Sequence, residues 1–91
     1  MLMKGKSIHK VEGGKLLRVY IEYEKERLQK VTICGDFFLY PEEKIKILEK
    51  EMSGLKFTNL QGEIGKIIKR NNLIILGFDS QSLAQAILEA R

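Results

Sequence analysis

The sequence predicts one α+β domain, in which a three- or four-stranded antiparallel sheet carries three helices packed on one face. Two observations predict it. Apolar residues in the first half of the chain alternate with polar ones, which is the period of a strand buried on one face. After Pro41, apolar residues recur every three or four positions, which is the period of an amphipathic helix. A length of 91 residues suits a single domain over residues 1–91.

Alternation defines the expected strands. It is clearest in Leu16–Glu24, where Leu17, Val19, Ile21 and Tyr23 share one face. The other expected strands are Ser7–Val11, Leu28–Gly35 and, as a further short strand, Leu73–Leu76. Turns are expected at Gly13-Gly14, because glycine adopts positive φ without steric cost, at the charged segment Lys25–Arg27, and at Gly35.

Capping residues mark the expected helices. Pro41 suits a first helical turn, and Glu42 and Glu43 complement the positive helix N-terminus. Asn59 and Asp79 are expected to cap the second and third helices. Gly54 and Asn71-Asn72 are expected to end the first and second helices. The helical residues expected to face the core are Ile45, Leu48, Met52, Leu60, Ile64, Ile67, Ile68, Leu83, Ala84, Ile87 and Leu88.

Few residues are suited to catalysis. His9 and Cys34 are the only histidine and the only cysteine, and they lie in different expected strands. A metal site needs three or four clustered ligands, which this composition does not supply. Glu42 and Glu43 are adjacent on a helix and do not face each other. We therefore expect no catalytic residue, no metal site and no cofactor bound by this chain alone.

The formal net charge is +4, and much of the excess lies early in the chain. Lysines at positions 4, 6, 10 and 15 and Arg18 are accompanied there only by Glu12. Such a patch suits a nucleic acid, a phosphate-bearing ligand or an acidic partner, or it simply aids solubility. No apolar run approaches the ~20 residues that span a bilayer, and the N-terminus lacks a signal-peptide core. We therefore expect a cytoplasmic protein.

The segment from Gly35 to Pro41 is the richest in aromatic residues. If the strand alternation continues, Phe37 and Leu39 are buried, and Phe38 and Tyr40 lie on the open sheet face. Arg18 and Tyr20 of the adjacent strand point to that face as well. Aromatic and arginine side chains are the usual anchors of interfaces. We predict a partner-binding surface of Arg18, Tyr20, Asp36, Phe38 and Tyr40; in the alternative, these aromatics cover the sheet edge or pack on the N-terminal segment.

Four pieces of the sequence together resemble a known family. They are Gly13-Gly14-Lys15 before a strand, Gly35-Asp36-Phe37-Phe38 at a strand end, Pro41-Glu42-Glu43 before a helix, and Gly77-Phe78-Asp79 before the last helix. Over nearly its whole length the chain resembles the C-terminal accessory domain of lipoate–protein ligases, which some archaea and bacteria make as a separate protein. The Gly35–Phe38 segment is the most specific piece. The charged turn at Lys25–Arg27 departs from the family, which often has glycine, asparagine or aspartate there.

The resemblance implies a non-catalytic subunit that acts with a catalytic subunit in lipoate adenylation and protein lipoylation. Lipoate and MgATP would then bind the catalytic subunit, and lipoyl acceptor domains would be transient partners; neither a membrane nor a nucleic acid is expected. Two alternatives remain at this point. One is a sulfur-acceptor or iron–sulfur scaffold-like protein that uses Cys34, although a position inside a strand argues against an exposed reactive thiol. The other is a small basic nucleic-acid-binding module, although the basic and aromatic residues are not interleaved as in RNA-binding sheets.

Overall fold

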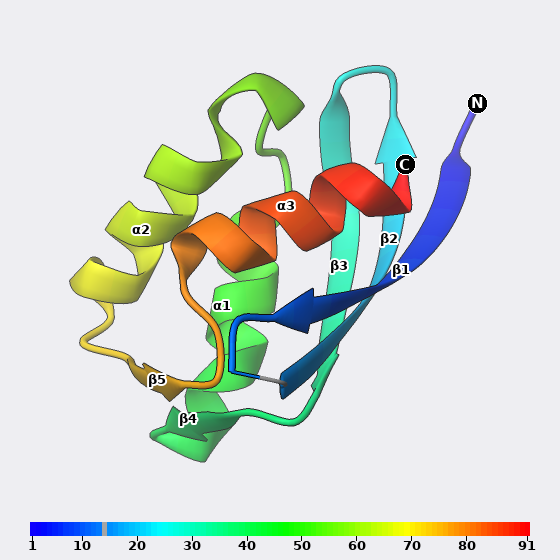
Figure 1. The fold of residues 1–91 in the computed structure, drawn as a ribbon. Coiled ribbons are helices and arrows are strands. Elements are labelled where there is room, and N and C mark those ends of the chain that lie inside the picture. The colour runs from blue at the N-terminus through cyan, green and yellow to red at the C-terminus, as the bar shows by residue number, and fades with distance from the viewer. Residues whose placement is uncertain (14) are drawn as a thin grey trace.

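Figure 1 shows the fold as a computed structural model, which describes residues 1–13 and 15–91. The turn predicted at Gly14 lies outside the described residues. In chain order the strands are β1 (Met3–Val11), β2 (Lys15–Glu24), β3 (Arg27–Gly35), β4 (Phe38–Tyr40) and β5 (Ile74–Leu76). The helices are α1 (Ile45–Met52), α2 (Leu60–Arg70) and α3 (Ser80–Ala90), and short 3₁₀ turns at Glu42–Lys44 and Phe57–Asn59 precede α1 and α2.

The first three strands form an antiparallel sheet in the order β1-β2-β3. Its inner face is apolar, as the alternation predicted. Val19 lies opposite Ile33 and Ile21 lies opposite Val31, and all four side chains are at most 5% exposed. Tyr23, expected on the same face, is half-buried and packs edge-to-face against Phe57. The meander and its buried face are therefore confirmed.

A β-bulge brings one more residue into this core. Glu22 pairs with Lys30, but Tyr23 pairs with Leu28, so Gln29 is an extra residue in β3. An extra residue reverses the alternation beyond it. Leu28 is therefore fully buried, on the same side as Val31, although the two positions differ in parity.

The short strand expected at Leu73–Leu76 is present as β5, but it does not join the three-stranded sheet. It pairs antiparallel with β4 in a separate two-stranded sheet, which we call the second sheet. Phe38 lies opposite Leu76, and Tyr40 lies opposite Ile74. Figure 1 shows the second sheet at the end of the molecule where β3 ends, with α1 beside it.

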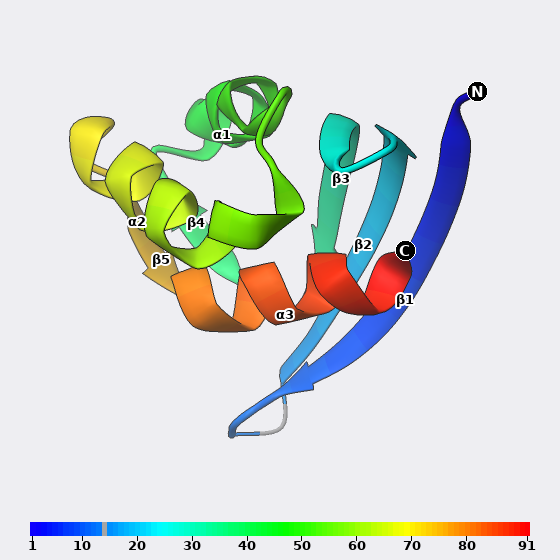
Figure 2. The same ribbon diagram turned by 90° about the horizontal axis from the view of Figure 1, so that it is seen from above.

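All three helices lie on one side of the three-stranded sheet (Figure 2), as expected. α3 contacts β1, β2 and α2, and α1 contacts β3 and α2. The core forms between these helices and the inner sheet face. Its helical members are Leu48, Met52, Leu60, Ile64, Ile67, Leu83, Ala84, Ala86, Ile87 and Ala90. Leu88, expected to point inward, is 38% exposed, whereas Ala86 is fully buried.

The capping predictions met different outcomes. Asp79 caps α3 in a capping box: its carboxylate accepts from the Ser82 backbone N–H at 2.8 Å, and the Ser82 hydroxyl accepts from the Asp79 N–H at 2.9 Å. Asn59 precedes α2, but within the described residues its side chain makes no capping hydrogen bond. The 3₁₀ turn Phe57–Asn59 leads directly into that helix instead. Gly54 follows α1 with a φ of 91°, as expected of a helix-ending glycine.

Candidate interaction surface

Two of the predicted partner-binding residues lie on the open face of the three-stranded sheet, away from the helices. Arg18 pairs with Ile8 and Cys34, and Tyr20 pairs with Lys6 and Thr32. We call this surface the outer sheet face. Its members by strand alternation are Lys4, Lys6, Ile8 and Lys10 of β1, Leu16, Arg18, Tyr20 and Glu22 of β2, and Lys30, Thr32 and Cys34 of β3.

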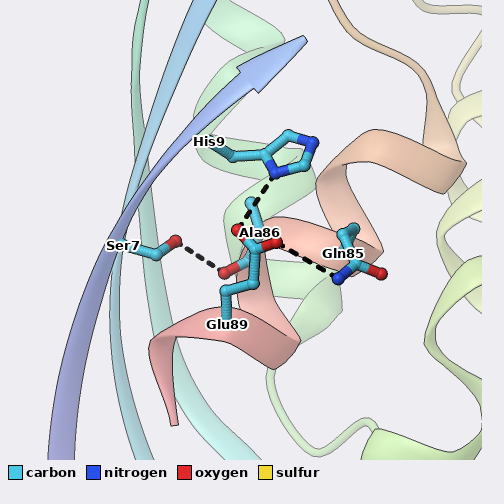
Figure 3. A network of polar contacts seen from close by, with 5 residues as sticks. All are labelled: Ser7, His9, Gln85, Ala86 and Glu89. Atoms are coloured by element: carbon cyan, nitrogen blue, oxygen red, sulfur yellow. Dashed lines mark hydrogen bonds and ion pairs between the residues drawn. The ribbon is translucent and has the colours of Figure 1, made fainter.

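The opposite face of β1 is occupied by α3, which confirms the assignment of sides. Figure 3 shows the polar contacts between the two elements. The Ser7 hydroxyl donates to the Ala86 carbonyl oxygen at 2.6 Å, and His9 Nδ1 lies 3.0 Å from Glu89 Oε1. Hydrogen bonds from Gln85 and then from His9 lower the pKa of Glu89. His9 thus joins β1 to α3.

Cys34 is not near this histidine. His9 lies on the helix side of β1, whereas Cys34 shares the outer sheet face with Arg18, and β2 separates the two strands. Cys34 is half-buried. In the described part of the chain, no group of three or more His, Cys, Asp or Glu side chains is placed to hold a metal ion. Residues 1–13 and 15–91 also contain no helix long and apolar enough to cross a membrane.

The other two predicted aromatic residues lie on the second sheet. Phe38 and Tyr40 are 58% and 59% exposed, whereas Leu39 between them is 5% exposed. The alternation expected for this segment is therefore present, but on a different sheet. Directly opposite lie Leu76 and Ile74, which are 66% and 60% exposed. These four side chains, Phe38, Tyr40, Ile74 and Leu76, form the apolar patch that we call the second-sheet face.

Ile74 and Leu76 were not among the predicted partner residues. Strand alternation predicts that two residues of this run are exposed, because a strand that covers a core on one side points alternate side chains outward. Leu73 is buried and Ile75 is half-buried, so residues 74 and 76 point outward. Because all four residues of the run are apolar, their hydropathy alone does not reveal which two are exposed.

Gly35 turns the chain from one surface to the other. Its φ is 141°, and a Cβ atom there would lie 2.3 Å from the carbonyl oxygen of Leu16. Only glycine fits both conditions, so this residue lets β3 end close against β2. Gly13, the other described turn glycine, has a φ of 95°.

The two surfaces adjoin at this turn. A hollow of about 340 Å³ is lined by Cys34 and Gly35 of β3 together with Phe38 and Glu42. A second hollow is lined by Lys15, Asp36, Phe38 and Leu76. Asp36 is exposed, and its backbone N–H donates to the Leu16 carbonyl oxygen at 2.8 Å. The five predicted residues are therefore in two neighbouring groups, with Asp36 at the junction.

Comparisons with known proteins add to this geometry. No protein-family model matches the chain. It is 28% identical over 72 residues to Lipoate-protein ligase A subunit 2 of Thermoplasma acidophilum, which covers 79% of this chain and 76% of that protein.

The fold has a solved counterpart. It is a chain from the structure of an archaeal lipoylation system, a bipartite lipoate protein ligase and its E2 lipoyl domain, from Thermoplasma acidophilum. The TM-score is 0.81 at 26% identity, over 96% of this chain and 97% of that chain. The sequence match covers most of the chain and the fold match nearly all of it, and both support the predicted resemblance to lipoate–protein ligase accessory subunits.

Proposed function

We propose that this chain is the non-catalytic accessory subunit of a two-chain lipoate–protein ligase. The supporting observations are a sequence match over 79% of this chain to a lipoate–protein ligase subunit 2, and a fold match over 96% of it to a chain from the structure of a bipartite lipoate protein ligase and its E2 lipoyl domain. In this role the catalytic subunit binds lipoate and MgATP, and this chain supports adenylation by binding that subunit. Lipoyl acceptor domains are its transient partners, and it acts in the cytoplasm.

The proposed contact with the catalytic subunit combines the two adjoining surfaces. It contains the predicted residues Arg18, Tyr20, Asp36, Phe38 and Tyr40, and it adds Ile74 and Leu76. Four large apolar side chains on one small sheet are 58–66% exposed. A cluster of exposed apolar side chains is typical of a protein–protein contact. A stable interface buries roughly 800 Å² on each partner, more than the second-sheet face alone provides. The contact therefore extends from it along the outer sheet face.

Neither alternative function is favoured by the comparisons.

Assembly tests the proposal. The purified chain, mixed with the catalytic subunit from the same organism, should elute from a sizing column as a one-to-one complex, with the mass of each peak measured by light scattering. Phe38→Ala should reduce the complex peak at low protein concentration. Two separate peaks at all concentrations for the unaltered proteins would contradict the proposed function.

A further inference from the structure

We propose that the outer sheet face binds an acidic surface of the catalytic subunit, as the electrostatic half of the interface whose apolar half is the second-sheet face. This inference rests on the proposed function and specifies the chemistry of the partner surface. It concerns a sheet face that none of the described helices and strands covers (Figure 2).

The first observation is the charge on this face. Of its described members, five are cations and one is an acid, Glu22; the cations are Lys4, Lys6, Lys10, Arg18 and Lys30. The difference of four positive charges equals the formal net charge of the entire chain. Glu24, at the end of β2, lies 3.3 Å from the N-terminal ammonium group and is neutralised by it. The excess positive charge of the protein is thus concentrated on one face.

The second observation is that these cations are exposed and that the described residues give none of them an ion-pair partner. Among the ion pairs of residues 1–13 and 15–91, none involves any of the five side chains. Cations on the helices are partly compensated, since Lys66 pairs with Glu63 and Arg70 pairs with Glu51. Glu22 lies opposite Lys4 and Lys30 in the strand pairing, but it is one carboxylate among five cations. An acidic partner surface would balance the charge that remains.

The third observation is the shape and position of the face. A hollow of about 380 Å³ on it is lined by three lysines and one acid, Lys4, Lys6, Lys30 and Glu22, together with Tyr20 and Thr32. At its other end, Arg18 pairs with Cys34, and Cys34 lines the same hollow as Phe38 of the second-sheet face. The charged and apolar surfaces are therefore continuous, and a partner seated on the second-sheet face lies next to the cations. Charge complementarity in such a position sets orientation and speeds association.

A matched pair of double variants tests the inference. Lys6→Glu with Arg18→Glu reverses two charges on the outer sheet face, and neither residue lies directly opposite a carboxylate in the strand pairing. Lys56→Glu with Lys69→Glu makes the same change in net charge at exposed sites before and within α2. The measurement is the Kd for the catalytic subunit at about 0.05 M and 0.5 M salt, where the Debye length falls from roughly 14 Å to 4 Å.

The outer-face variant should bind at least about tenfold more weakly at low salt and should lose most of the salt dependence. The control variant should stay within about twofold of the unaltered chain at both salt concentrations. Carbodiimide cross-linking, which joins a lysine amine to a carboxylate in contact with it, should link Lys4, Lys6 or Lys30 to the catalytic subunit, and mass spectrometry would identify the pairs.

Three results would overturn the inference. Equal weakening by both double variants would show a general charge effect. Cross-links through Lys56 or Lys69 alone would place the interface elsewhere. Binding of a mixed-sequence single-stranded RNA that only the outer-face variant loses, with an unchanged Kd for the catalytic subunit, would make the face a nucleic-acid surface. In each case the proposed function stands if the unaltered chains still form a complex, and it fails only if they do not.

Discussion

Phe37 and Phe38 are neighbours in the sequence with opposite surroundings. Phe37 is half-buried and packs edge-to-face against the buried ring of Phe78, with 4.9 Å between the ring centroids. Phe38 is 58% exposed on the second-sheet face. Phe37→Ala should lower the free energy of unfolding by about 3 kcal/mol, the low end for a buried aromatic, because the site is only half-buried. Phe38→Ala should change it by less than ~0.5 kcal/mol.

Binding should show the reverse order. Phe38→Ala should weaken the complex with the catalytic subunit by about 2 kcal/mol, roughly thirtyfold in Kd, because an aromatic anchor is lost. Urea titrations give the free energy of unfolding of each variant, and binding isotherms give its Kd for the catalytic subunit. If Phe38→Ala unfolds the domain and Phe37→Ala only loses binding, the assignment of sides is reversed. If neither variant changes Kd, the second-sheet face is not the interface.

Gly5 shows a constraint that the sequence pattern does not carry. It lies in β1 where the strand passes the end of α3, and a Cβ atom there would lie 1.7 Å from the Ala90 carbonyl oxygen. Gly5→Ala should therefore destabilise the domain by about 2–3 kcal/mol, since strand and helix must move apart. Gly62→Ala in α2 is the control: a Cβ atom at Gly62 would have no neighbouring atom within 4 Å, and the change should stabilise by about 0.5–1 kcal/mol. Thermal melts measure both variants. An equal fall in melting temperature for Gly5→Ala and Gly62→Ala would contradict the close packing of β1 against α3.

Cys34 offers a test between the proposed function and sulfur transfer. If it is only a strand residue on the outer sheet face, Cys34→Ser should leave stimulation of the ligase within a few-fold of the unaltered chain. The assay is acceptor lipoylation in the presence of the catalytic subunit. Complete loss of activity in a folded variant would indicate chemistry at the thiol.

At the scale of single elements, local signals were reliable where a side chain acts on its own backbone. Asp79 was expected to cap α3 and does so, because the carboxylate needs only the N–H groups one turn ahead. Asn59 has the same capacity, but the 3₁₀ turn that starts at buried Phe57 sets the entry into α2 instead. Burial of an aromatic residue outweighs a cap that is worth about 1 kcal/mol.

The Asp79 cap should be sensitive to pH. The hydrogen bond from the Ser82 backbone N–H lowers the pKa of this carboxyl from its ordinary value of 3.8. A carboxylate whose pKa is lower when folded stabilises the fold above its unfolded pKa, and the effect is lost as pH falls through the folded value. Asp79→Ala should therefore cost about 1 kcal/mol at pH 7. In urea titrations the difference from the unaltered chain should shrink below pH 3.8; a constant difference would contradict the role of the charge.

Which strands pair was harder to infer than where the strands lie. The alternation from Leu17 to Ile33 predicted the three-stranded sheet and its buried face because each strand follows the last through a short turn. The pairing of β4 with β5 joins segments that lie more than thirty residues apart in the sequence, with two helices between them. No local pattern reports such a contact, so the sequence did not show that Ile74 and Leu76 lie beside Phe38 and Tyr40. Strand alternation alone, by contrast, predicted that Phe38 and Tyr40 point away from the core.

At the scale of the whole molecule, the fold determines which basic residues gather on one surface. The sequence shows an excess of lysine near the N-terminus, but Lys30 comes from a different strand and lines the same hollow as Lys4 and Lys6. The antiparallel register brings them together on one face. The composition therefore predicted a basic patch, and the sheet topology determines its extent and its junction with the apolar second-sheet face.

The most direct test of the accessory role is reconstitution of the reaction. The purified chain, its catalytic subunit and a lipoyl acceptor domain are incubated with lipoate and MgATP, and the acceptor mass is followed by mass spectrometry. We predict no lipoyl-adenylate and no lipoylated acceptor with this chain alone, and both products when the two chains are combined. Adenylation by this chain alone, or an unchanged rate when it is added to the catalytic subunit, would contradict the accessory role.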